Sequence, residues 1–292
     1  MQRWLVGVRL ATLAALPLAP AVAAEPADPA LALYTQYAAL GTQLMNNAFG
    51  RPLHIDSREG HGRLDGDVYV LLGYPFAQVK RTLGAAQRWC DIMLLHLNVK
   101  GCRRAAGDAS VLHLYVGRKF DEPLTAAYRI DFHYRGLAGT QDYFQASLTA
   151  ARGPFGTHDY RLAVEAVPLG DRTFLHLSYA YAYGGPAKAA MRAYFATAGE
   201  GKVGFTAERR RPDGTPVLVG GLRGALERNV MRYYLAIDAY LGTQSAPPEE
   251  RLEDRLREWF ESTERYALQL HELGEDAYLA MKRRECAASG ES

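Results

Sequence analysis

The sequence predicts an α+β fold in which an antiparallel β-sheet wraps around one long C-terminal helix. After Gly101 and up to residue 221, segments that alternate apolar and polar residues are separated by short Gly, Pro and Asp turns, and short turns favour antiparallel pairing. From residue 222 to 241, apolar residues instead recur every three or four positions, which is typical of an amphipathic helix. A sheet with one apolar face must cover that face, and this helix is the expected cover.

The composition is that of an ordinary globular protein without an excess of charge. Of its 292 residues, 48% are hydrophobic and 23% are charged. The formal net charge is +2, and it comes from Arg3 and Arg9, because the chain has 34 basic and 32 acidic residues and every acidic residue follows residue 24. The remaining chain is therefore neutral, which argues against a partner bound through nucleic-acid phosphates.

Residues 1–24 have the layout of a secretory signal peptide. Two arginines precede an apolar run at residues 10–18, and small residues follow at 21–24. The run is too short to span about 30 Å of hydrocarbon, and Pro17 and Pro20 disfavour the alternative of an uncleaved anchor helix. We expect cleavage near residue 24 and a soluble protein exported to a periplasm.

An oxidising compartment permits disulfide bonds between the cysteines. Cys90 and Cys102 are close in sequence and are the expected pair, which leaves Cys286 over in a polar tail whose last residues, 287–292, we expect to be frayed. The alternative is that all three cysteines are reduced. No CxxC spacing is present, so neither a thioredoxin-like motif nor a zinc ribbon is indicated.

The N-terminal third after the linker at 25–30 is predicted to begin and end with helices. Leu33, Tyr37, Leu40 and Leu44 recur at helical spacing and predict a helix over 31–49. Alternation then predicts one or two strands over 53–72, with a turn at Gly60 to Gly62. Two short helices are expected next, over 76–83 and 85–95.

The rest of the chain is predicted as strands followed by two long helices. A helix over 186–199 interrupts the strands, and a final helix over 249–284 follows the one at 222–241. The predicted strands lie at 111–120, 126–137, 142–153, 159–170 and 173–185, with 202–210 and 216–221 completing the strand region around a turn at Asp213 and Gly214.

This order of elements resembles the START-like (helix-grip) superfamily. The resemblance covers residues 52–243 and includes YPFAQV directly after a strand, Trp89 near the end of the short helices, and the helix at 222–241. It divides the chain into a signal peptide at 1–24, a linker and helix at 25–51, a START-like domain at 52–243, and a helical extension at 244–292. It also implies a cavity between sheet and long helix, where members of the superfamily bind lipids, sterols, polyketides or plant hormones, and some are cyclases or hydroxylases.

The strand pattern is compatible with such a cavity. One face of the last long strand presents Leu175, Leu177, Tyr179, Tyr181 and Tyr183, and tyrosines offer a large apolar area with a polar tip. The alternative is that these rings form a filled core or cross-strand pairs. The residues expected to contact a ligand are Trp89, Tyr128, Phe132, Tyr179, Tyr181, Tyr233 and Ile237.

The sequence shows no motif for catalysis, a metal or a cofactor. His113, His133 and His176 lie on separate strands and could converge on zinc, but their charged or small polar neighbours indicate a wet outer face. GxSxG is absent, and Glu165 is expected to be exposed rather than a buried base. The basic run Glu208 to Arg211 reads as a hairpin end that could touch anionic phospholipid headgroups.

Three functions are therefore considered. The favoured one is an exported protein that binds or carries a hydrophobic small molecule, most simply a lipid. The second is an exported cyclase or hydrolase on the same fold, which would need a close His–Glu or Tyr–His pair in the cavity. The third is an envelope interaction protein that uses the helices at 31–49 and 249–284 as its partner surface.

Overall fold

The computed structural model describes residues 28–137, 140–185, 187–189, 191 and 201–290. The expected signal peptide at 1–24 lies outside these residues, and so does most of the helix expected at 186–199. Within the described part of the chain, no helix combines the length and apolarity needed to cross a membrane.

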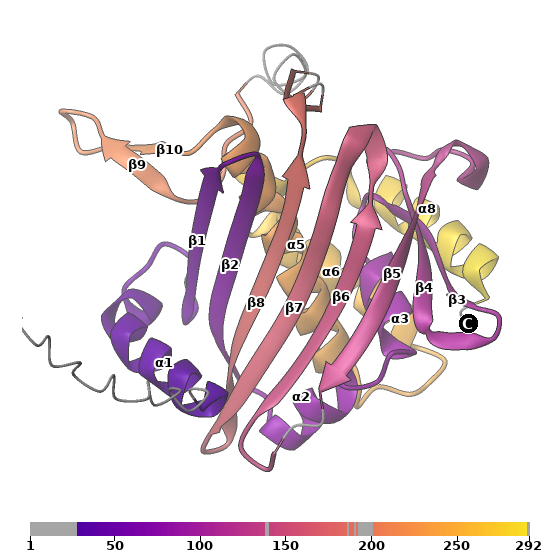
Figure 1. Ribbon diagram of the computed structural model, residues 1–292, viewed down its shortest axis with the longest axis horizontal. Coiled ribbons are helices and arrows are strands. Elements are labelled where there is room, and N and C mark those ends of the chain that lie inside the picture. Colours follow the sequence, from indigo (N-terminus) through magenta and orange to yellow (C-terminus); the bar gives the residue numbers. More distant parts are fainter. Residues whose placement is uncertain (1–27, 138–139, 186, 190, 192–200, 291–292) are drawn as a thin grey trace, which may run out of the picture.

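One antiparallel sheet of eight strands forms the centre of the molecule (Figure 1). Its strand order is β1-β2-β8-β7-β6-β5-β4-β3, so each connection within the sheet joins neighbouring strands except the one from β2 to β3, which crosses to the opposite edge through the two short helices between residues 76 and 94. The strands are β1 (Leu53–Gly60), β2 (Arg63–Leu72), β3 (Val99–Ala105), β4 (Asp108–Val116), β5 (Tyr128–Leu137), β6 (Phe144–Arg152), β7 (Thr157–Leu169) and β8 (Arg172–Tyr183).

The helices cover mainly one face of this sheet (Figure 1). The long helix α5 lies across that inner face, as its periodicity predicted. Leu226 and Val230 pack against Gly66 of β2, where a Cβ would lie 3.0 Å from the leucine side chain, so glycine permits this close approach. The helices are α1 (Pro29–Met45), α2 (Phe76–Leu83), α3 (Arg88–Leu94), α5 (Gly221–Gly242), α6 (Arg251–Glu264), α7 (Ala267–Leu270) and α8 (Glu275–Ser289).

Strand alternation places the aromatic face of β8 toward α5, as expected. Leu175, Leu177 and Tyr179 are all buried in the main core, whereas Ser178 and His176 point to the other face. Each fully buried leucine contributes about 1.5–3 kcal/mol relative to an exposed one. The predicted fold class, a sheet gripping a long C-terminal helix, is therefore confirmed.

The predicted disulfide joins α3 to the sheet. Cys90 on α3 is bonded to Cys102 on β3. This bond is confirmed, but the expected tail around Cys286 is not. Helix α8 continues to Ser289, Cys286 is 1% exposed, and the side chain of Arg103 donates to the carbonyl oxygen of Ala288.

The other face of the sheet is covered at one edge by α1. Its buried residues Leu33, Leu40 and Leu44 form a second apolar core with Val167 and Phe174. The apolar stripe of this helix is therefore covered by its own chain rather than left as a free surface. The helix ends at Met45, four residues earlier than predicted, and the side chain of Asn47 donates to the main-chain oxygens of Leu44 in the last turn of the helix and of Arg51 beyond it.

The single helix predicted over 249–284 is wrong, because the chain turns twice and forms α6, α7 and α8. His271 is extended and Gly274 precedes α8, and the turn brings Glu272 to Arg232 on α5. Trp259 and Tyr278 stack on each other within the main core. The apolar stripe continues through the turns, so periodicity alone did not reveal them.

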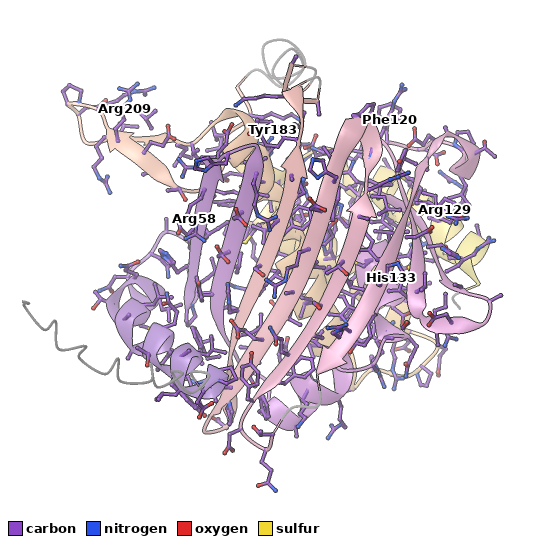
Figure 2. All side chains as sticks on the ribbon, in the orientation of Figure 1. Arg58, Phe120, Arg129, His133, Tyr183 and Arg209 are labelled. Atoms are coloured by element: carbon purple, nitrogen blue, oxygen red, sulfur yellow. A yellow bond between two sulfur atoms is a disulfide. The ribbon has the colours of Figure 1, made fainter. Side chains whose placement is uncertain are left out.

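Residues 202–210 and 216–221 do not extend the sheet as predicted. They hold β9 (Ala207–Arg210) and β10 (Pro216–Leu218), which pair only with each other. The predicted turn between them is present, and Gly214 has a positive φ of 84°. The ribbon projects from the body with Arg209 near its tip (Figure 2), so its charged residues remain in solvent.

Candidate ligand-binding site

A hollow of about 270 Å³ lies between the inner face of the sheet and α5. We call it the tyrosine hollow. Its size is close to the lower limit of pockets that hold small molecules, about 300 Å³. Its lining is formed by His96, Asn98, Leu114, Val116, Gly117, Ile130, Phe132, Pro154, Phe155, Thr157, Tyr160, Tyr179, Tyr181, Met191, Asn229 and Tyr233.

Four tyrosine rings line the hollow and pack on one another. Tyr160 stacks on Tyr181 with ring centroids 5.2 Å apart, and Tyr179 meets Tyr233 edge-on at 5.2 Å. Burial raises the pKa of Tyr179, Tyr181 and Tyr233 above the ordinary value, so their hydroxyl groups stay protonated at neutral pH. The rings therefore offer a neutral, largely apolar surface with a few hydroxyl groups.

The connection between β6 and β7 borders the hollow on the side of solvent. Phe155 is 84% exposed, although it is a large apolar residue, and its φ is 57°. At Gly153, a Cβ would lie 2.3 Å from the ring of Tyr160, so only glycine lets that ring take its place. The hydroxyl group of Thr157 lies 2.7 Å from the Tyr160 hydroxyl, within hydrogen-bond distance.

Of the seven residues predicted to contact a ligand, four line this hollow: Phe132, Tyr179, Tyr181 and Tyr233. The other three lie elsewhere. Trp89 is 1% exposed and donates its indole N–H to the carbonyl oxygen of Leu83, and Ile237 is fully buried in the core. Tyr128 has the inward parity of its strand, but it lies at the first residue of β5, where the sheet ends, and is 45% exposed.

Sequence reasoning missed several polar and aromatic residues of the hollow. Tyr160 shares a strand face with Leu162 and Val164, and this alternation could have identified it. His96 follows α3 within an apolar run, and such a histidine is expected to be buried. Asn98 and Asn229 carry no comparable signal, because their neighbours are not diagnostic.

On the outer face of the sheet, His176 lies between two carboxylates. Its Nε2 is 2.8 Å from Asp67 and its Nδ1 is 2.8 Å from Glu165, which also accepts from the Tyr143 hydroxyl at 2.7 Å. Burial lowers the pKa of His176, but the two carboxylates outweigh it and the net pKa is raised. Glu165 is thus half-buried and partnered, not exposed as expected.

The three histidines considered as zinc ligands, His113, His133 and His176, do not converge on one site. His113 pairs with Asp131, and two strands, β6 and β7, separate β5 from His176 on β8. In the described ranges no group of three His, Cys, Asp or Glu side chains could hold a metal ion. An enzyme on this fold would need a close His–Glu or Tyr–His pair in the cavity. The close His–Glu pair lies on the face of the sheet opposite the tyrosine hollow, whereas His96 and Tyr233 both line the hollow, with ring centroids 4.7 Å apart.

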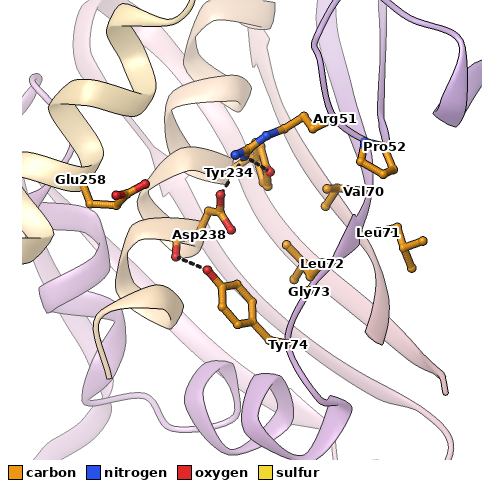
Figure 3. A pocket seen from close by; sticks show the side chains of 10 residues that line it. All are labelled: Arg51, Pro52, Val70, Leu71, Leu72, Gly73, Tyr74, Tyr234, Asp238 and Glu258. Carbon is orange, nitrogen blue, oxygen red and sulfur yellow. Dashed lines mark hydrogen bonds and ion pairs between the residues drawn. The ribbon is translucent and has the colours of Figure 1, made fainter. Parts of the chain in front are cut away.

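A second hollow of about 310 Å³ lies between β2 and α5 (Figure 3). Arg51 donates to the carboxylate of Asp238 at 2.7 Å and to the hydroxyl of Tyr234 at 2.5 Å, and the Tyr74 hydroxyl donates to the main-chain oxygen of Asp238. Its Arg51 and Asp238 are already paired with each other. This arrangement joins the N-terminal segment to α5 and is less suited to an apolar ligand than the tyrosine hollow.

Comparison with known proteins gives matches to solved structures only. No family model and no curated protein matches the sequence. Human StAR-related lipid transfer protein 5 is 12% identical at a TM-score of 0.32, over 57% of this chain and 89% of its own. Ara h 8.0201 is 8% identical at 0.35, over 66% and 99%. A START superfamily protein from Mycobacterium smegmatis is 17% identical at 0.28, over 51% and 95%. No site residue is transferred from these structures.

Proposed function

We propose that this protein binds or carries a hydrophobic small molecule, most simply a lipid, in the tyrosine hollow. The observation that supports it is the hollow itself: about 270 Å³ between sheet and helix, lined mainly by aromatic and aliphatic side chains with few polar groups. Such a lining favours a ligand that is mostly apolar. The position of the hollow beneath α5 is also the one that the START-like resemblance implied.

The test is direct binding of an apolar probe. The chain from residue 25 is purified, stripped of lipid and titrated with the neutral fluorophore N-phenyl-1-naphthylamine. We expect saturable fluorescence enhancement, together with a co-purified apolar molecule in native mass spectrometry before stripping. A protein that carries no apolar molecule and does not enhance the fluorescence would refute the proposal.

Export is part of the proposal. The layout of residues 1–24 supports secretion, and a bond between Cys90 and Cys102 suits an oxidising compartment. Expression of the full chain in a Gram-negative host, followed by fractionation and intact-mass measurement, should place a chain that starts near residue 25 in the periplasm. Recovery of the full-length chain from the cytoplasm would contradict it.

We also propose a transient contact with an anionic membrane surface through the β9–β10 ribbon. Arg209, Arg210 and Arg211 are exposed, while Glu208 is paired with Arg223. Basic residues at an anionic surface contribute about 1 kcal/mol each. The wild-type protein should therefore bind phosphatidylglycerol vesicles, and a variant with the three arginines replaced by serine should bind them much more weakly, while binding to phosphatidylcholine vesicles should not change. If the variant binds phosphatidylglycerol vesicles as well as wild type does, the ribbon is not the membrane contact.

A further inference from the structure

One end of the tyrosine hollow carries a buried hydrogen-bond donor without a partner. His96 lines the hollow and is 1% exposed, and its ring stacks on Tyr233 at 4.7 Å. Its Nδ1 accepts from the backbone N–H of Asn98 at 3.1 Å, which assigns the proton to Nε2. That buried Nε2 has no hydrogen-bond partner among the described residues. Such groups are rare in folded proteins, and a bound ligand is one way to satisfy them.

Next to His96 lies a cluster of positive charge, here called the basic cluster, in which Lys100, Lys282 and Arg232 are buried and Lys119 and Lys202 are half-buried. Glu272 accepts ion pairs from Lys119, Lys202 and Arg232, and Glu285 accepts from Lys100 and Lys282. Five cationic side chains thus share two carboxylates, which leaves a formal excess of three positive charges. In proteins, buried charges are normally paired, so this excess favours an additional anion.

Arg232 links the basic cluster to the hollow. It lies on α5 beside Tyr233, is 1% exposed, and keeps its Nε and one Nη without a partner in the part of the chain that the structure describes. Burial, followed by the charge of Arg232, holds the pKa of His96 well below its usual value, so the imidazole is neutral. A neutral Nε2–H in a positive field is suited to donate to an anionic oxygen.

We propose that the tyrosine hollow selects an apolar molecule that ends in a carboxylate. The carboxylate accepts the hydrogen bond of His96 Nε2–H and lies in the field of the basic cluster, and the apolar chain lies among the tyrosines. This inference rests on the proposed binding function and adds the chemical class of the ligand. A volume of about 270 Å³ fits one chain of medium length rather than a whole phospholipid.

The experiment compares ligands that differ only at one end. Dodecanoate, methyl dodecanoate and dodecan-1-ol are used to displace N-phenyl-1-naphthylamine from the stripped protein at pH 7.5. We expect dodecanoate to bind at least about tenfold more tightly than either neutral ligand, which is the range of a hydrogen bond to a charged group.

Two substitutions of one residue provide the matched pair. His96→Asn keeps an acceptor near the Nδ1 position but removes the donor at Nε2, whereas His96→Gln places an amide donor near Nε2. His96→Asn should weaken the binding of dodecanoate far more than that of the methyl ester and so lose most of the preference for dodecanoate, and His96→Gln should retain part of that preference. Far-UV circular dichroism and thermal unfolding show whether each variant is folded.

The outcomes separate the two proposals. If the fluorophore binds but wild type does not distinguish acid from ester, the carboxylate inference is wrong and the apolar site stands. If neither the fluorophore nor any of the three ligands binds, both proposals fall. If the variants weaken acid and ester equally, His96 is only part of the wall, and the assignment of the carboxylate to its Nε2 is overturned.

Discussion

Asn229 lies on α5 and lines the tyrosine hollow, so replacing it by phenylalanine tests whether the hollow is real space. The wild-type side chain is half-buried. Fully burying a phenylalanine side chain contributes about 1.5–3 kcal/mol. Because part of the ring remains exposed at this position, we expect a stabilisation of about 1–2 kcal/mol. For a chain of this size, that corresponds to a rise of roughly 2–4 °C in Tm.

The same substitution should weaken ligand binding. The ring displaces roughly three methylene groups of a bound chain, and each buried methylene is worth about 0.8 kcal/mol. The loss is then about 2.4 kcal/mol, or roughly fiftyfold in Kd. Stability and affinity thus move in opposite directions.

Thermal unfolding and fluorophore titration of the same preparations measure both quantities. Asn229→Ala is the control, since it removes the amide without filling the space and should leave affinity near that of wild type. If Asn229→Phe is instead destabilised by about 1–3 kcal/mol, as in overpacked cores, and binding does not change, then the space under α5 is already filled and the reasoning is refuted.

Three further predictions concern stability. Replacing Cys90 and Cys102 by serine should cost about 3 kcal/mol in urea unfolding, from loop-closure entropy over a sequence separation of 12 residues. Trp259→Ala should cost about 3–5 kcal/mol, because the indole is 1% exposed and donates to the carbonyl oxygen of Arg232. The pKa of His176 is raised in the folded protein, so its partners stabilise the fold fully below about pH 6.5, and this contribution is lost as pH rises through the raised folded value. The difference in unfolding free energy between wild type and His176→Gln should therefore shrink from pH 5.5 to pH 9.

Each of these has a control or an opposing result. Reduced wild type should unfold at the same urea concentration as the double serine variant, and a clear difference between them would point to a cause other than the bond. A Trp259→Ala variant as stable as wild type would show that α6 does not belong to the core. A pH-independent difference for His176→Gln would mean that His176 does not gain its proton more readily in the folded state.

Tertiary contacts explain the main errors in the sequence-based predictions. The stripe over 249–284 continues through two turns, because α6, α7 and α8 all face the same core while they change direction around Arg232 and Glu272. Tyr128 has the correct parity for the inner face, yet it lies at the end of its strand and is exposed. Periodicity reports which side of an element faces the core, but not where the core ends.

Patterns along the chain predicted most of the antiparallel strands with their inward aromatic face, the helix α5 and the Cys90–Cys102 bond, because each follows from local alternation, helical spacing or proximity in sequence. The three-dimensional packing was needed to show which tyrosines line a hollow, and that His96 lies at its end beside the basic cluster. A hollow is the space left where side chains from distant segments do not pack against one another, so its shape depends on the relative positions of those segments. No pattern within one segment carries that information.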